Sequence, residues 1–186
     1  MTERDLAQNL KQITNQYEEF KKIAIHLKWS DCHEKHFEWY RKYPLGLVIS
    51  IYSFPGNYVE THFNDAFVQC CISELAFNEE WDKQFFNTSE SERNIYINNA
   101  EKSTFNPYHN VCTWEELRLK PVTADFLRKE IRKYTDANEP ILDHQGNFLL
   151  LDKMAIIEIG GCYNGDSDYI AADENCIIRI NCGIWD

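Results

Sequence analysis

The spacing of apolar residues predicts a long amphipathic helix near the start of the chain. Between residues 5 and 29, apolar side chains recur at alternating steps of four and three. This 3.5-residue period draws one apolar stripe along a helix. The stripe can pack against a sheet of the same chain or pair with a second copy in a coiled coil. Its members are Leu6, Leu10, Ile13, Tyr17, Phe20, Ala24 and Leu27.

A second helix is predicted directly after this stripe. Ser30 and Asp31 are good N-cap residues, and Glu34 follows Asp31 at the spacing of a capping box. The helix is expected to end by Tyr43, because Pro44 disfavours helical backbone in the residue before it.

The next segment has the pattern of a β-hairpin followed by a helix. Residues 47–54 are rich in β-branched and aromatic side chains and predict a strand. Residues 55–57 form a Pro-Gly-Asn turn, so residues 58–63 are expected to return as the second strand. A long helix is then predicted from Asn64 or Asp65 to about residue 86.

The region from residue 88 to residue 134 is less regular. Residues 88–92 are interpreted as a polar loop and residues 95–97 as a short strand. A capping box at Thr113 predicts a short helix ended by Pro121. Thr123 is then expected to cap a further helix that runs to about Tyr134.

The last third of the chain reads as short strands joined by turns. A tight turn at 143–147 separates two short apolar runs, and three further strands are predicted. Connections this short allow only antiparallel pairing. We therefore expect an α+β fold in which N-terminal helices pack on a mostly antiparallel sheet. The three strands are residues 155–159, 169–172 and 177–181.

Length and composition are those of a globular protein. The 186 residues fit a single domain, 1–186, with a possible helical and hairpin lobe at 1–110 and an α+β region at 111–186. No apolar run has the length of a membrane span, and the charged start lacks the pattern of a signal peptide. Seven cysteines at irregular spacing indicate buried reduced thiols. We therefore expect a cytoplasmic protein.

The charge of the chain bears on its partners. The net charge is −11, and residues 136–186 hold ten acidic residues against two basic ones. Such a charge disfavours binding to nucleic acid or anionic lipid and favours a basic protein partner. Solubility alone is the other explanation of the same charge.

Two groups of residues could hold a metal ion. Cys32, His36, His109 and Cys112 could provide the ligands of a Cys₂His₂ zinc site, but only their residue types favour it, and surface histidines with a buried thiol are the simpler explanation. Residues 164–168 gather oxygen ligands as calcium loops do, but they lack the glutamate that ends an EF-hand loop. A turn held by aspartate and asparagine side chains explains that segment without a metal.

Catalytic signatures are not found in the sequence. Cys70 and Cys71 fall within a predicted helix and lack the basic neighbour that activates a thiol, and His33 and His36 are too close for a zinc-protease helix. No nucleophile elbow or glycine-rich phosphate loop occurs. We therefore predict a binding protein without catalytic residues, cofactor or metal.

A weak family resemblance lies in the C-terminal part. The runs IIEIGGCYNGD at 156–166, DYIAAD at 168–173 and CIIRI at 176–180, preceded by KPVTADFL at 120–127, resemble the core of SUKH-type bacterial immunity proteins. The resemblance covers roughly residues 113–182. It implies an α+β protein, monomeric or homodimeric, that neutralises a bacterial toxin such as a basic nuclease.

The residues predicted to bind the partner are acidic and aromatic. Acidic side chains near the end of the chain would face a basic surface, and aromatic side chains among them would anchor it. The competing hypothesis is a small metal- or thiol-dependent enzyme that uses the histidines and cysteines named above. The predicted partner-binding residues are Asp166, Asp168, Asp173, Glu174, Tyr163 and Trp185.

Overall fold

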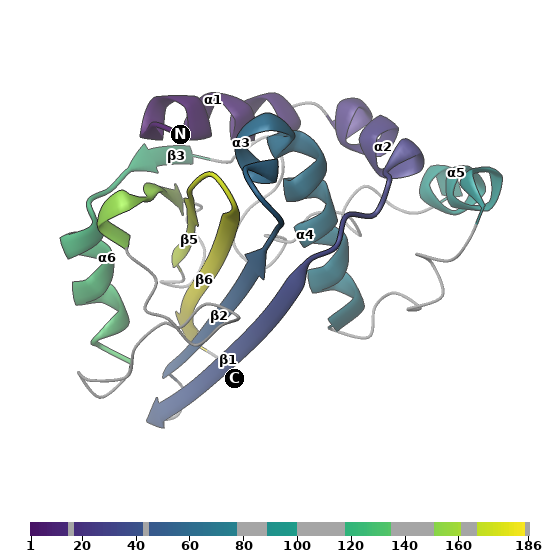
Figure 1. Cartoon of the computed structure of the whole chain (residues 1–186). Helices are drawn as coiled ribbons and strands as arrows, with labels where there is room; N and C mark the ends of the chain where they lie inside the picture. Colours follow the sequence, from purple (N-terminus) through teal and green to yellow (C-terminus); the bar gives the residue numbers. More distant parts are fainter. Residues whose placement is uncertain are drawn as a thin grey trace.

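The protein has an α+β fold in which helices cover both faces of one six-stranded antiparallel sheet (Figure 1). The computed structural model describes residues 1–14, 17–42, 45–77, 89–99, 118–134, 151–160 and 167–184. The helices are α1 (Glu3–Thr14), α2 (Tyr17–His26), α3 (Tyr58–Thr61), α4 (Phe63–Phe77), α5 (Glu90–Asn99) and α6 (Ala124–Ile131), with a 3₁₀ turn η3 (Leu151–Lys153). The strands are β1 (His33–Lys42), β2 (Leu45–Ser53), β3 (Arg118–Pro121), β4 (Ala155–Gly160), β5 (Ser167–Ala172) and β6 (Cys176–Ile184).

The sheet joins the two halves of the chain. Its strand order is β1-β2-β6-β5-β4-β3, and each neighbouring pair is antiparallel. The N-terminal hairpin β1–β2 therefore meets the C-terminal strands through the β2–β6 pair, in which Ser53 faces Cys176 and Ile49 faces Ile180. The β3 edge is short and ends at Pro121, which cannot donate to a ladder and suits an edge.

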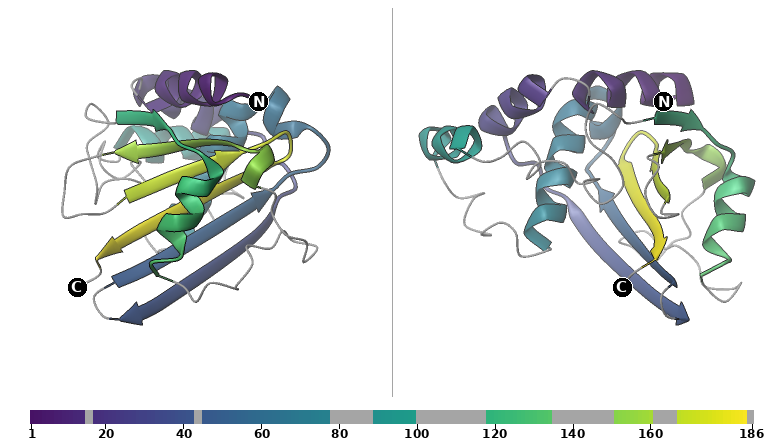
Figure 2. Two further views of the ribbon diagram at one scale, coloured as in Figure 1. Left: turned by 90° about the vertical axis from the view of Figure 1, so that its left-hand side faces the viewer. Right: turned by 180° about the vertical axis from the view of Figure 1, so that it is seen from behind.

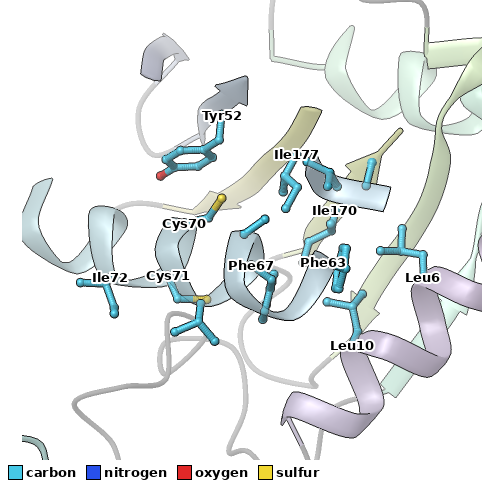
Figure 3. Packing of buried hydrophobic residues seen from close by; sticks show 14 of the residues in the cluster. Leu6, Leu10, Tyr52, Phe63, Phe67, Cys70, Cys71, Ile72, Ile170 and Ile177 are labelled. Carbon is cyan, nitrogen blue, oxygen red and sulfur yellow. The ribbon is translucent and has the colours of Figure 1, made fainter. Parts of the chain in front are cut away.

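One face of the sheet carries the larger hydrophobic core. Leu6 and Leu10 of α1 and Phe63 and Phe67 of α4 pack with sheet residues such as Ile170 (Figure 3). Phe20 and Ala24 of α2, and Leu27 directly after it, join the same cluster, and each is at most 5% exposed. The stripe members whose side chains the structure describes, Leu6, Leu10, Phe20, Ala24 and Leu27, are thus buried within their own chain.

The other face carries a second core beneath α6. Helix α6 lies across this face of the sheet (Figure 2). Its residues Leu127 and Ile131 are buried against strand residues that include Ile156 and Ile178. Thr123 caps α6, because its Oγ1 accepts a hydrogen bond from the Phe126 N–H at 3.2 Å. This confirms the predicted helix at 123–134, and β4, β5 and β6 confirm the three predicted C-terminal strands.

The helix predicted at 31–43 is wrong, since this segment is β1. Residues 33–42 pair with β2 along their whole length, from His33 opposite Ser53 to Lys42 opposite Leu45. Long-range pairing with an apolar neighbouring strand outweighs a local capping signal, and the aromatic content of the segment suits a strand. In a strand, His33 and His36 point to opposite faces.

Two other segments predicted as strands are helical. Gly56 turns the chain with a φ of 59°, and residues 58–61 then form α3 instead of a returning strand, because β2 already pairs with β1 and β6. Residues 90–92 of the predicted loop and residues 95–97 of the predicted strand belong to α5. A capping box starts α5: the Ser89 N–H donates to Glu92 Oε2 at 2.8 Å, and the Glu92 N–H donates to Ser89 Oγ at 3.3 Å.

The remaining predictions for the middle of the chain have mixed outcomes. Helix α4 begins at Phe63, close to the predicted start, and the structure describes it to Phe77. Residues 118–121 form β3 instead of the end of a helix. The rest of the helix predicted at Thr113, together with the segments at 78–88 and 135–150, lies outside the described residues.

Candidate functional site

The β5–β6 turn holds two of the predicted acidic residues. Asp173 Oδ1 accepts hydrogen bonds from the N–H groups of Asn175 at 2.9 Å and Cys176 at 2.8 Å, so this carboxylate shapes the turn. Glu174 is exposed, and its carbonyl accepts a hydrogen bond from the Glu60 N–H at 3.1 Å. The turn is therefore fixed beside α3.

A surface hollow of about 330 Å³ lies next to this turn. It is formed where α1, α3 and α4 meet, and Glu60 and Asp65 bring two carboxylates to its wall. No lysine or arginine is among the described residues that line it. The Met1 ammonium lies 4.0 Å from Glu60 Oε1, while Asp65 makes no ion pair within the described residues. The lining residues are Asn9, Glu60, Thr61, His62, Phe63, Asn64 and Asp65.

Hydrogen bonds determine the tautomer of His62 in this hollow. The Thr61 hydroxyl lies 3.1 Å from the Asn57 carbonyl oxygen and 3.4 Å from that of Tyr58, so its single proton is donated to these carbonyls. The 2.8 Å contact between Thr61 Oγ1 and His62 Nδ1 must then be an N–H donated by the ring. In the neutral imidazole, Nε2 is left as a hydrogen-bond acceptor.

An aromatic stack supports the His62 ring. Tyr58 lies parallel to His62 with 4.8 Å between ring centroids, and Phe54 stacks on Tyr58 at 5.4 Å. Burial and the nearby carboxylate of Asp65 raise the pKa of Tyr58, so its hydroxyl stays protonated at neutral pH. The imidazole is therefore held by one face against a rigid neighbour.

Asp168 is a third residue that was predicted to lie at the partner-binding surface. It is instead buried, with 0% exposure. Its Oδ1 accepts a hydrogen bond from Asn181 Nδ2 at 3.1 Å and lies 3.7 Å from Arg179 Nε. Residues alternate between the faces of a strand, and Asp168 shares its face with Ile170 of the larger core. Its carboxylate therefore interacts with residues of its own chain, Asn181 and Arg179.

A line of polar groups crosses the same face of the sheet beneath α4. Ser73 Oγ donates to Glu34 Oε1 at 2.8 Å, Glu34 Oε2 lies 3.7 Å from His36 Nε2, and His36 Nδ1 lies 3.0 Å from Ser50 Oγ. A carboxylate, an imidazole and a serine hydroxyl in this order are the groups of a nucleophilic site. Ser50 is only 1% exposed, however, so a substrate has no access to its hydroxyl in this structure.

Burial holds three of the described thiols, Cys32, Cys70 and Cys182, in their protonated form. Burial raises the pKa of Cys32 and of Cys182 to about 12, and that of Cys70 well above its usual value. Cys71 and Cys176 are also buried. All five are free cysteines, which fits the predicted role of reduced thiols as small core residues.

The metal sites predicted as alternatives are only partly covered by the structure. Within the described ranges, no group of three or more histidine, cysteine, aspartate or glutamate residues is placed to hold a metal ion. His109 and Cys112, which the zinc hypothesis needs, lie outside those ranges, as do residues 164–166 of the calcium hypothesis.

The structure brings together only part of the predicted partner-binding set. Tyr163, Asp166 and Trp185 lie outside the described residues. Glu60, His62 and Asp65 were missed by sequence reasoning, although Tyr58 and His62 stand at the spacing of helix neighbours. That spacing was a usable signal for α3.

Comparison with known proteins adds no relative. The search against family models, against curated protein sequences and against solved structures found no match to this chain. In the part of the chain that the structure describes, no helix is both long and apolar enough to cross a membrane.

Proposed function

We propose that this protein binds a basic protein partner through its acidic end, defined as Glu60, Asp65, Asp173 and Glu174, and thereby acts as an immunity protein that neutralises a toxin. The observation that carries the proposal is the juxtaposition of the β5–β6 turn with the hollow. Acidic side chains from two distant parts of the sequence meet there on one surface. The resemblance of residues 113–182 to SUKH-type proteins supports the same class of function.

The distribution of positive charge supports a defined direction of approach. One group of basic side chains lies on β3, on α6 with the two residues that follow it, and on η3, and α6 covers the other face of the sheet; other basic residues, such as Arg4 and Lys11, lie on α1. A basic partner is attracted to the acidic end and repelled by this group, so the field orients the encounter. The basic residues of this group are Arg118, Lys120, Arg128, Lys129, Arg132, Lys133 and Lys153.

The test compares two variants with the same change in net charge. The first removes the acidic end with Glu60→Gln, Asp65→Asn, Asp173→Asn and Glu174→Gln. Asparagine at position 173 keeps the oxygen that accepts the turn hydrogen bonds. The control neutralises four acidic residues elsewhere with Glu3→Gln, Glu18→Gln, Glu19→Gln and Asp31→Asn.

Wild type, variant and control are each used to capture proteins from a lysate of the source organism, and the captured proteins are compared. Association rates of the three are then measured with the purified partner. We expect one basic protein to be retained by wild type and control, and its toxic activity to be blocked by stoichiometric wild-type protein. Association of the acidic-end variant should be slowed about tenfold or more at low salt. Equal association rates for variant and control would contradict the proposal.

A further inference from the structure

We infer that the hollow between α1, α3 and α4 receives an arginine side chain of the basic partner. This inference rests on the proposed function and gives the acidic end a specific anchor. Its basis is the chemistry of the lining: two carboxylates, from Glu60 and Asp65, and the His62 imidazole, with no lysine or arginine among the described residues of the lining. The Met1 ammonium lies 4.0 Å from Glu60 Oε1, so an incoming cation competes with it for this carboxylate.

The ionisable groups that line the hollow are acceptors. Carboxylates have no donor at neutral pH, and the Thr61 hydroxyl already uses its proton on backbone carbonyls. In its neutral form, the His62 ring uses its single N–H on Thr61, and Nε2 is then an acceptor. A ligand that matches these groups must be cationic and rich in donors.

Among protein side chains, arginine fits these requirements better than lysine. Its planar guanidinium carries five N–H donors and stacks on aromatic rings, whereas lysine offers a compact point charge. His62 is exposed, and Tyr58 covers only one of its faces. A guanidinium stacked on the other face has Glu60 and Asp65 available as carboxylate partners from α3 and α4.

The probes for this inference are three short peptides: acetyl-Gly-Arg-Gly-amide, the same peptide with lysine, and the same peptide with citrulline. Citrulline has nearly the shape of arginine without its charge. Each is titrated into the ¹⁵N-labelled full chain at low salt, and amide shifts of residues 60–65 are followed. We expect saturable shifts with arginine, binding about two- to fivefold weaker with lysine because stacking is lost, and none with citrulline.

Variants separate the charge from the stacking. Glu60→Gln with Asp65→Asn should abolish binding of both cationic peptides, whereas Glu18→Gln on α2 should leave it unchanged. His62→Ala should remove the preference for arginine over lysine while weak binding of both remains. His62 is exposed, so this substitution removes no core contact.

The results for this anchor and for the proposed function can be told apart. Equal binding of the arginine and lysine peptides, or no saturable shift at residues 60–65, would overturn the arginine anchor even if the acidic end controls association of the partner. Conversely, a partner that binds the acidic-end variant at the control rate would overturn the proposed function, whatever the peptides show.

Discussion

The two faces of the sheet differ in how they are filled. Beneath α6, the face is apolar, with Ile49, Ile156 and Ile178 buried side by side with other hydrophobic residues. Beneath α1 and α4, the larger core shares its face with Asp168 and Arg179, a buried carboxylate next to a guanidinium. The same strands build both faces, so alternate residues of one short segment have opposite environments.

The difference between the two faces indicates which residues specify the pairing register of the strands. In β6, Ile178 and Ile180 face α6, whereas Arg179 and Asn181 fall on the face that contains Asp168. A one-residue slip of β6 would place a guanidinium in the apolar core. We expect the polar residues to contribute to the correct register more than to stability, because a buried ion pair is costly to desolvate.

The largest effect is expected from breaking the ion pair on one side. Asp168→Ala removes the buried carboxylate that lies 3.7 Å from Arg179 Nε and accepts a hydrogen bond from Asn181, which should lower the free energy of unfolding by about 3–5 kcal/mol. The double variant Asp168→Val with Arg179→Met replaces the pair by apolar side chains and should come close to wild type. Urea denaturation measures both. A double variant as unstable as the single one would show that the pair is needed for stability.

A smaller or similar loss is expected on the apolar face. Ile178 is 0% exposed, and Ile178→Ala should cost about 2–5 kcal/mol because it removes buried methyl groups and leaves a cavity. Ile178→Val, the matched control, should cost only about 0.5–1.5 kcal/mol. Both are measured by chemical denaturation. Equal losses for the two variants would indicate that this face rearranges around the substitution.

The smallest effect concerns the attachment of α6. Arg128 donates to Asp152 at 2.9 and 2.7 Å, and these hydrogen bonds lower the pKa of Asp152 from its usual 3.8. A lowered folded-state pKa adds stability above the unfolded pKa, and this is lost as pH falls through the folded value. Unfolding free energies of wild type and Arg128→Gln should therefore differ slightly at pH 7 and converge below pH 3.8. A constant difference down to pH 2 would exclude Asp152 as the cause.

The sequence predicted the elements whose signals are local. The strand-forming residues of β4, β5 and β6 and the Thr123 cap of α6 lie in or next to the elements that they specify. Helix α5 also had a local signal, the Ser89–Glu92 capping box, which the interpretation as a loop overlooked. For strand β1 the local capping signal pointed to a helix and only the aromatic content favoured a strand, because its conformation depends on pairing with β2.

The candidate site was less predictable than the fold. Asp173 and Glu174 were found from charge, but their neighbours Glu60 and Asp65 are more than a hundred residues away in sequence. Only the backbone bond between Glu60 and Glu174 shows that they share a surface. For Asp168, charge alone led to a wrong prediction of exposure: although the residue lies in an acidic segment, the register of its strand buries it.

The β2–β6 pairing has a consequence for biosynthesis. Ser53 and Cys176, which meet at one end of this pair, are separated by 123 positions. During translation the β1–β2 hairpin must therefore wait, with one edge of β2 unpaired, until β6 has left the ribosome. A lone hairpin is at best marginally stable, and an open apolar edge favours aggregation. We thus expect this chain to fold slowly, after most of it is synthesised, and to depend on chaperones more than a fold closed by sequence-adjacent strands.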